Sequence, residues 1–178
     1  MLRNTADRYG LIAILLHWLL AVTILALFGF GLWMTGLDYY DPWYRRAPDL
    51  HKSVGVLLFI LMGLRLAWRV GNPVPRAPPR QRRLAAASHR LLYLLLFAVM
   101  IAGYLISTAD GRPITVFGLF KIRATLSGLD NQEDIAGAAH ELLAFALIGL
   151  AALHALAALK HHFIDHDRTL QRMLGRKH

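Results

Sequence analysis

The sequence contains no cysteine. This excludes disulfide bonds, iron–sulfur clusters held by cysteine, thiol catalysis and the covalent attachment of c-type haem through a C-x-x-C-H motif. Charged residues are also scarce, at 17% of the 178 residues, whereas hydrophobic residues make up 56%. The hydrophobic residues stand in long runs, which is typical of membrane spans rather than of a soluble domain.

Four such runs predict an all-α fold, an integral membrane four-helix bundle that forms a single domain. The expected helices cover about residues 11–34, 51–70, 88–108 and 135–163. Each reaches the roughly 20 residues that a spanning helix needs, and the lack of alternation favours helices over barrel strands. The first run is too long for the hydrophobic part of a cleavable signal, and no A-x-A-like site follows it, so we expect it to be retained.

Acidic residues are absent from the connection between the second and third runs. This connection carries Arg69, Arg76, Arg80, Arg82, Arg83 and Arg90. The positive-inside rule places such a segment in the cytoplasm, and with four spans both termini lie there too. Its prolines predict an extended linker over residues 71–87. Because topology accounts for the arginines, the net charge of +9 does not call for nucleic acid as a partner.

Histidines within the hydrophobic runs are the main candidates for function. His140 and His154 are 14 residues apart, which puts them on one helix face, offset by ~40° and separated by ~21 Å along the axis. A hydrocarbon core is about 30 Å thick, so one lies towards each leaflet. This arrangement suits two cofactor planes, one above the other.

Each of these histidines needs a partner at its own depth. Topology pairs His17 with His154 at the cytoplasmic side and His51 with His140 at the outer side. Two imidazoles on one iron leave no open position, which suits electron transfer. Alone, each histidine is equally compatible with a hydrogen bond to a neighbouring helix. A zinc site needs four ligands in one cluster, which the ~21 Å separation does not favour.

Further polar residues flank these pairs. His89 opens the third helix on the cytoplasmic side and is an alternative inner ligand, or a partner of a haem propionate or a quinone headgroup. Arg65 lies within the second helix, where it pairs with a propionate or extends its charge to the surface. His161 lies almost two turns beyond His154, either facing a quinone at the membrane surface or forming part of a solvated basic tail.

Several short motifs carry a resemblance over essentially the whole chain. They are LHW (16–18), H-K-S-x-G (51–55), HRLLY (89–93), AAHE (138–141), LHAxAALKHH (153–162) and DRTLQRM (167–173). In these the sequence resembles the bacterial cytochrome b561 family of small di-haem membrane cytochromes. The resemblance implies that His17, His51, His140 and His154 are haem ligands.

The same resemblance implies two non-covalent b-type haems, a ubiquinone partner and a place in the bacterial inner membrane. It also implies superoxide oxidase activity, in which electrons from periplasmic superoxide pass through the haems to ubiquinone. Steering of the superoxide anion needs cations near the outer haem, and Lys52, Arg45 and Arg46 are the candidates. The outer loops also hold seven carboxylates, so only local clustering of the cations provides steering.

Two alternatives remain open at this point. One is a cytochrome b subunit that anchors a membrane dehydrogenase or hydrogenase and relays its electrons, which usually has more spans or larger extensions. The other is a metal transporter that uses histidine. A transporter needs a continuous polar pathway, whereas the stretch between His140 and His154 is apolar apart from Glu141.

Overall fold

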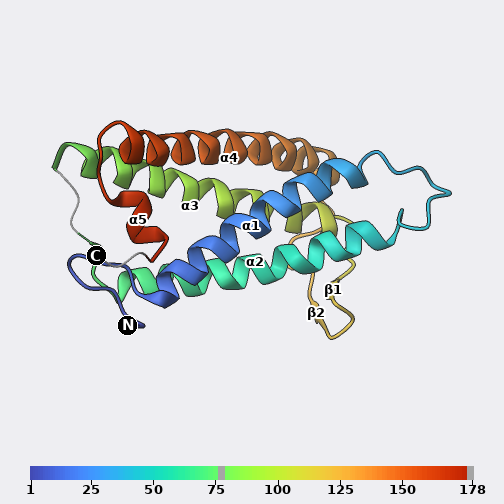
Figure 1. The fold of residues 1–178 in the computed structure, drawn as a ribbon. Coiled ribbons are helices and arrows are strands. Elements are labelled where there is room, and N and C mark those ends of the chain that lie inside the picture. The colour runs from blue at the N-terminus through green and yellow to red at the C-terminus, as the bar shows by residue number, and fades with distance from the viewer. Residues whose placement is uncertain (76–78, 176–178) are drawn as a thin grey trace.

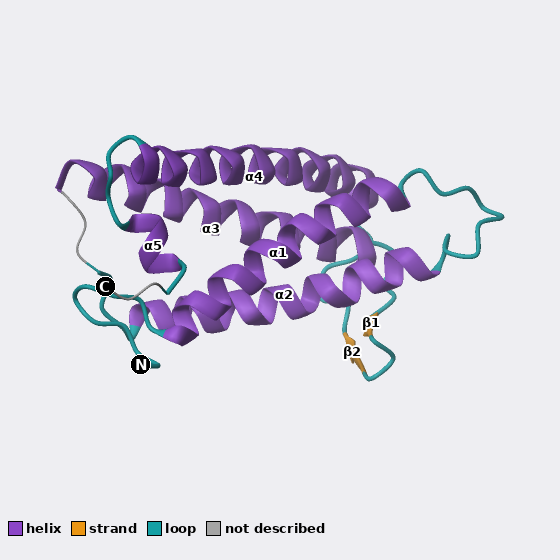
Figure 2. Cartoon of the chain, in the orientation of Figure 1, coloured by secondary structure: helices purple, strands orange, loops and turns teal. Residues whose placement is uncertain are grey.

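The computed structural model of the protein describes residues 1–75 and 79–175. Four long helices run lengthwise beside one another: α1 (Leu11–Met34), α2 (Arg46–Val70), α3 (Pro79–Thr108) and α4 (Gln132–Phe163). All four are long and apolar enough to cross a membrane. Most loops lie at the two ends of the bundle, and the segment between α3 and α4 projects beside α2 (Figure 2). This confirms the predicted all-α, four-helix membrane architecture.

The helix bounds agree with the sequence prediction for α1 and extend further for the others. Helix α2 begins at Arg46 rather than near residue 51, and α4 begins at Gln132 rather than near residue 135. Helix α3 begins at Pro79, so part of the expected linker 71–87 is helical. Proline fits the first position of a helix because its missing N–H would have no helical partner there. Arg76 of the linker and the tail residues 176–178 lie outside the described residues.

The core is small and lies at the centre of the bundle. It contains Leu20, Leu58, Met62, Leu96, Val99 and Leu147, contributed by all four long helices. Many other large apolar side chains stay more than half exposed, among them Leu25 and Leu142. An apolar surface of this extent suits a lipid environment rather than water.

The N-terminal segment and α5 (Thr169–Met173), the last described helix, lie at the same end of the bundle, as an even number of spans requires (Figure 1). The short helix α5 folds back there against the start of α1. The Trp18 indole N–H donates a hydrogen bond to the Met173 carbonyl at 2.9 Å. The N-terminal segment is also held, since the Asn4 side chain donates to the Pro73 carbonyl.

The segment that connects α3 to α4 in the sequence forms a β-hairpin near the other end of the bundle. Strands β1 (Ile114–Val116) and β2 (Phe120–Ile122) are antiparallel. The hairpin packs on α2 through Ser53, whose hydroxyl accepts a hydrogen bond from the Phe117 N–H at 3.0 Å. Residues 114–122 thus form an ordered hairpin that projects beside the helices (Figure 1).

Candidate functional site

Two histidines face each other at the end of the bundle opposite the termini. His51 comes from the first turns of α2 and His140 from the first turns of α4, and their ring centroids are 6.2 Å apart. With metal–nitrogen bonds of about 2 Å, two imidazoles on either side of one metal ion have centroids roughly 6 Å apart. The spacing of this pair therefore fits bis-histidine ligation of one iron.

The surroundings of His140 fix its ring in a form that is able to bind metal. Its Nδ1 lies 2.8 Å from the carbonyl oxygen of Val99 in α3, so Nδ1 carries the proton and donates. The Nε2 atom is then the unprotonated nitrogen, which is the usual arrangement for a metal ligand. A Cβ atom on Gly103 would come within 3.1 Å of this ring. Glycine at this position therefore leaves the space that the imidazole occupies.

His51 is held in a similar way from α1. Its ring stacks on Phe30, with an interplanar angle of 10°, and a Cβ on Gly31 would lie 3.3 Å from its Cε1 atom. Its Nδ1 atom is buried and has no hydrogen-bond partner within the described part of the chain.

A second group of histidines lies at the end near the termini. The rings of His89 and His154 have centroids 5.2 Å apart, and His17 lies within electrostatic range of both. Helices α1, α3 and α4 thus each contribute one imidazole to this inner group. Of the expected inner pair, His154 contacts His89, while the Nδ1 atom of His17 lies 3.2 Å from Nη2 of Arg65.

Arg65 gives the inner group a cation with unused hydrogen-bonding capacity. Its Nε donates to the Tyr93 hydroxyl at 3.1 Å. Its Nη1 and the Trp68 indole nitrogen are buried without a partner among residues 1–75 and 79–175. Guanidinium and indole groups only donate. Two buried donors one turn apart on α2 therefore fit an acceptor such as the carboxylate of a haem propionate.

Other cations gather behind Arg65. Arg69 lies over the Tyr93 ring, 5.6 Å from its centroid. Burial raises the pKa of the Tyr9 phenol, an effect that the charges of Arg69, Arg172 and Arg65 oppose. This end of the bundle is positive around the inner histidines, which favours an anionic group there.

At the opposite end, the three cations predicted to attract superoxide differ in their surroundings. The Lys52 ammonium lies 2.8 Å from the Asp49 carboxylate, one turn earlier in α2. Arg45 and Arg46 are exposed at the start of the same helix. Of the other loop cations, Arg112 pairs with Asp110, and its hydrogen bonds hold the pKa of that carboxyl below its usual value.

His161 lies at the end of α4 in a charged cluster. Its Nδ1 is 2.6 Å from Oδ2 of Asp165, and the Lys160 ammonium lies 2.9 Å from both oxygens of the same carboxylate. Hydrogen bonds from Lys160 and His161 lower the pKa of Asp165. The imidazole is thus oriented by a carboxylate rather than freely solvated.

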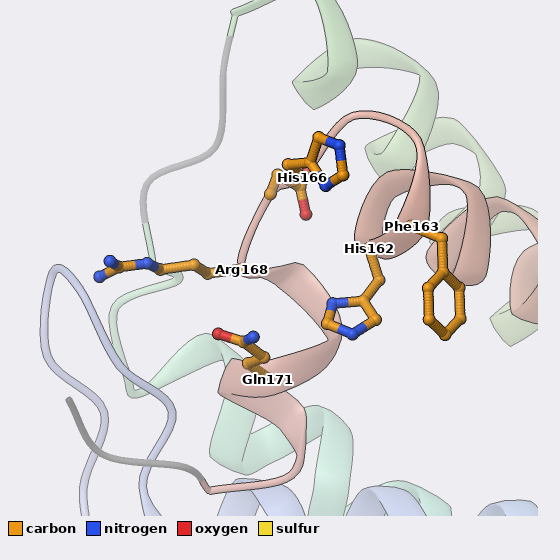
Figure 3. A pocket seen from close by; sticks show the side chains of 6 residues that line it. His162, Phe163, His166, Arg168 and Gln171 are labelled. Atoms are coloured by element: carbon orange, nitrogen blue, oxygen red, sulfur yellow. The ribbon is translucent and has the colours of Figure 1, made fainter.

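A polar pocket of about 500 Å³ lies next to this cluster, between α4 and α5. Its lining consists of His162, Phe163, His166, Asp167, Arg168 and Gln171. His162 from the end of α4 and Gln171 from α5 point into the same space (Figure 3). A volume of this size lies within the range of small-molecule sites.

Several contributors to these sites were missed from the sequence. They are the Val99 carbonyl, Gly103, Trp68 and Tyr93. A small residue inside an apolar run indicates that another group packs closely against the helix. Of the four contributors, Gly103 is therefore the one that the sequence could have identified. Within the described residues, no three His, Asp or Glu side chains come together as a metal-binding group, so the histidine pairs are the arrangement that this geometry offers to a metal.

Comparison with known proteins agrees with this geometry. The chain is 52% identical to cytochrome b561 homolog 2 of Escherichia coli K12 over 177 residues, covering 97% of this chain and 94% of that one. It is 34% identical to a probable superoxide oxidase, CybB, of Yersinia pestis over 175 residues, covering 96% and 97%. A cytochrome b561 homolog 1 of E. coli K12 is 28% identical over 179 residues, covering 96% and 99%.

The family model described as prokaryotic cytochrome b561 matches residues 8–176. Four apolar helices together with this match indicate a multi-pass protein of the bacterial inner membrane. The family carries b-type haem, which the two histidine groups and the donors around Arg65 fit. The chain belongs to the prokaryotic cytochrome b561 family, and it is a membrane oxidoreductase of electron transport.

Proposed function

We propose that this protein oxidises superoxide at the end of the bundle that carries His51 and His140, and passes the electrons to ubiquinone at the other end. The observation that carries this proposal is the placement of two imidazole groups at two depths, joined along one face of α4 by His140 and His154. About 21 Å separates these two residues along the helix axis. Haem bound at each depth would supply one-electron transfer, and the histidines that would hold it lie at two depths of the bundle.

We assign the histidines to two ligand sets. His51 and His140 form the outer set. His17 and His154 form the inner set, with His89 as the alternative partner of His154. Arg65 and Trp68 would hold a propionate of the inner haem, since their buried donors need an acceptor.

The charges of the connections between helices indicate which end of the bundle faces the cytoplasm, and therefore the direction of electron transfer. Arginines crowd the connection at the end of the termini, so the positive-inside rule assigns that end to the cytoplasm. The pair His51 and His140 then lies at the periplasmic side. A relative at 34% identity that is called a probable superoxide oxidase supports superoxide as the donor.

The overall reaction is balanced in electrons and protons. Two superoxide anions lose one electron each and leave as two molecules of dioxygen. One ubiquinone takes up these two electrons and two protons to form ubiquinol. Lys52, Arg45 and Arg46 attract the anion. Asp49 offsets part of the charge of Lys52, and salt limits the reach of the remaining attraction to about 8 Å at physiological ionic strength.

The test is reduction of the haems by a pulse of superoxide, followed by absorbance at two salt concentrations. We expect fast reduction that slows as salt rises, and slower reduction in Lys52→Glu. Arg8→Glu is the control, because it makes the same change in net charge at the opposite end of the bundle. Slow reduction that does not depend on salt concentration in the wild type, Lys52→Glu and Arg8→Glu would favour the alternative. In that alternative the protein is an anchor and relay subunit that receives electrons from a partner dehydrogenase.

His161 is the residue that we assign to the quinone. It lies beyond His154 on α4, beside the polar pocket, and Asp165 orients its ring. We expect His161→Ala to keep the haem absorption bands and to lose most of the quinone-dependent turnover. Arg8→Ala, at the same end of the bundle but outside the lining of the pocket, is the comparison variant and should retain turnover. Normal turnover in His161→Ala would remove His161 from the quinone site.

A further inference from the structure

The hairpin between α3 and α4 ends in an exposed apolar tip. Its turn places Phe117 and Phe120 about half exposed and leaves Leu119 81% exposed. Ile114 and Val116 of β1 are buried instead, so the base of the hairpin packs on the protein while its tip does not. Three large apolar side chains at the tip of a loop outside the helices need a partner or a lipid environment.

The backbone of the turn indicates that an aromatic residue at the tip has a role. Phe117 has a φ of +48° and is followed by Gly118 at +74°. The left-handed region suits glycine and asparagine, whereas a bulky residue there is unfavourable. Placing phenylalanine at this position costs conformational energy that an aqueous turn would avoid with glycine or asparagine.

Hydrogen bonds fix the depth of the hairpin relative to the helices. Ser53, which is 2% exposed, accepts from the Phe117 N–H at 3.0 Å and donates to the Asp49 carbonyl at 2.8 Å. Ser53 stands between the charged Lys52 and an uncharged run that continues to Leu64. The hairpin is therefore attached where α2 passes from its polar start into its lipid-spanning part.

The hairpin also points in the direction that a membrane interface requires. It projects sideways from α2, across the helix axes, rather than along them beyond the end of the bundle (Figure 1). Because the helix axes cross the membrane, a sideways projection at this depth runs along the membrane plane. Lys121 pairs with Thr115 on the face of the hairpin opposite Val116, where its ammonium is exposed.

We propose that the hairpin tip, Phe117–Phe120, inserts into the headgroup and upper acyl region of the phospholipid leaflet at the end of the bundle opposite the termini. The aromatic rings suit the interface because they combine apolar area with tolerance of nearby polar groups. Lys121, next to the tip in β2, interacts with lipid phosphate. The hairpin thus holds the α2 segment that carries His51 at a fixed depth.

The absence of cysteine makes single-site labelling a direct test. Leu119→Cys carries the probe, and Tyr40→Cys is the matched control, since it is 91% exposed in the α1–α2 loop at the same end of the bundle. Each full-length variant is labelled with a small environment-sensitive fluorophore and reconstituted into phosphatidylcholine vesicles. Quenching is measured with aqueous iodide and, separately, with lipids brominated near the top of the acyl chain.

We expect iodide to quench the Leu119 probe severalfold less than the Tyr40 probe, and brominated lipid to quench the Leu119 probe severalfold more. Equal quenching of the two probes by iodide would overturn the proposal, because the tip would then lie in water. Protection of the Leu119 probe from both quenchers, lost on dilution of the protein within the vesicles, would also overturn it in favour of a second copy covering the tip. Unchanged circular dichroism checks that each variant is folded.

Discussion

Gly103 controls how closely His140 lies against α3. A methyl group at this position would approach Cε1 of His140 to 3.1 Å and Nδ1 to 3.2 Å. Both distances are tighter than most contacts of a Cβ atom, so Gly103→Ala should shift the ring by a few tenths of an ångström and weaken its hydrogen bond to Val99. We expect this variant to lose part of one haem, measured as haem per protein in a pyridine haemochrome assay.

Gly149→Ala is the matched control for this substitution. It lies in α4, and a Cβ there meets nothing within 4 Å. Alanine favours the helix at both positions, so only the contact with His140 distinguishes the two variants. Equal haem content in both would show that the ring tolerates the added methyl group and that Gly103 does not position it.

Asp165 gives the end of α4 a pH-dependent contact. Hydrogen bonds from Lys160 and His161 lower its pKa from the usual 3.8, so the folded protein binds this proton less readily than the unfolded chain. The stabilisation is therefore complete above about pH 4 and is lost as the pH falls through the lowered pKa. We expect Asp165→Asn to lower Tm slightly at neutral pH, with a difference from wild type that shrinks to nothing in acid.

The effect of Asp165 should be small because the ion pair is exposed to solvent. Melting curves from neutral to acidic pH measure it, with Asp7→Asn at the same end of the bundle as the control. A difference between wild type and Asp165→Asn that persists unchanged in acid would mean that the carboxylate acts through packing rather than through its charge.

Spacing in the sequence predicted that His140 and His154 share a helix face at different depths, but it did not predict how they are held. Helix geometry converts the 14-residue interval between His140 and His154 directly into a shared face and a separation of about 21 Å along the axis. The contacts of His140 with Val99 and Gly103 depend on the register of α3 against α4, which no local pattern encodes. The contact of His89 with His154 depends on the same register and was expected only as an alternative.

At the scale of elements, hydropathy located the helices and misplaced their ends. It detects the part of a helix that lies in lipid, so α1, which is apolar throughout, was predicted with its observed bounds. Helices α2 and α3 begin with polar turns that lie outside the apolar runs. The hairpin was not predicted as strands, because three-residue strands have little local signal and depend on hydrogen bonds to Ser53 in a distant helix.

Ser53 is therefore the residue through which the hairpin and α2 stabilise each other. Ser53→Ala would leave the Phe117 N–H without its acceptor and should cost about 1–3 kcal/mol. We expect a lower Tm in detergent and faster proteolytic cleavage within the hairpin. Ser107→Ala is the control, since within the described part of the chain its hydroxyl bonds to the Gly103 carbonyl in its own helix. Equal Tm values for the two variants would show that the hairpin is held by apolar packing alone.

At the scale of the whole molecule, the bundle separates two polar groups by an apolar middle. The core residues Leu58 and Leu96 lie between the histidine groups, so the groups do not share side chains. Helix α4 links them, because it carries one imidazole of each. A disturbance at one end therefore reaches the other end mainly through the position of this helix.

This separation predicts two haems per chain that are lost independently. Wild-type protein should give a haemochrome stoichiometry near two. His51→Ala should remove one component of the redox titration and leave the other near its original potential, and His154→Ala should remove the other component. His140→Ala should match His51→Ala, because their rings face each other at 6.2 Å. Comparison of His17→Ala with His89→Ala then identifies the ligand that pairs with His154. Only loss of a true ligand should remove the redox component that His154→Ala removes. A stoichiometry near one in the wild type, or loss of both components in His51→Ala, would contradict the two-site arrangement.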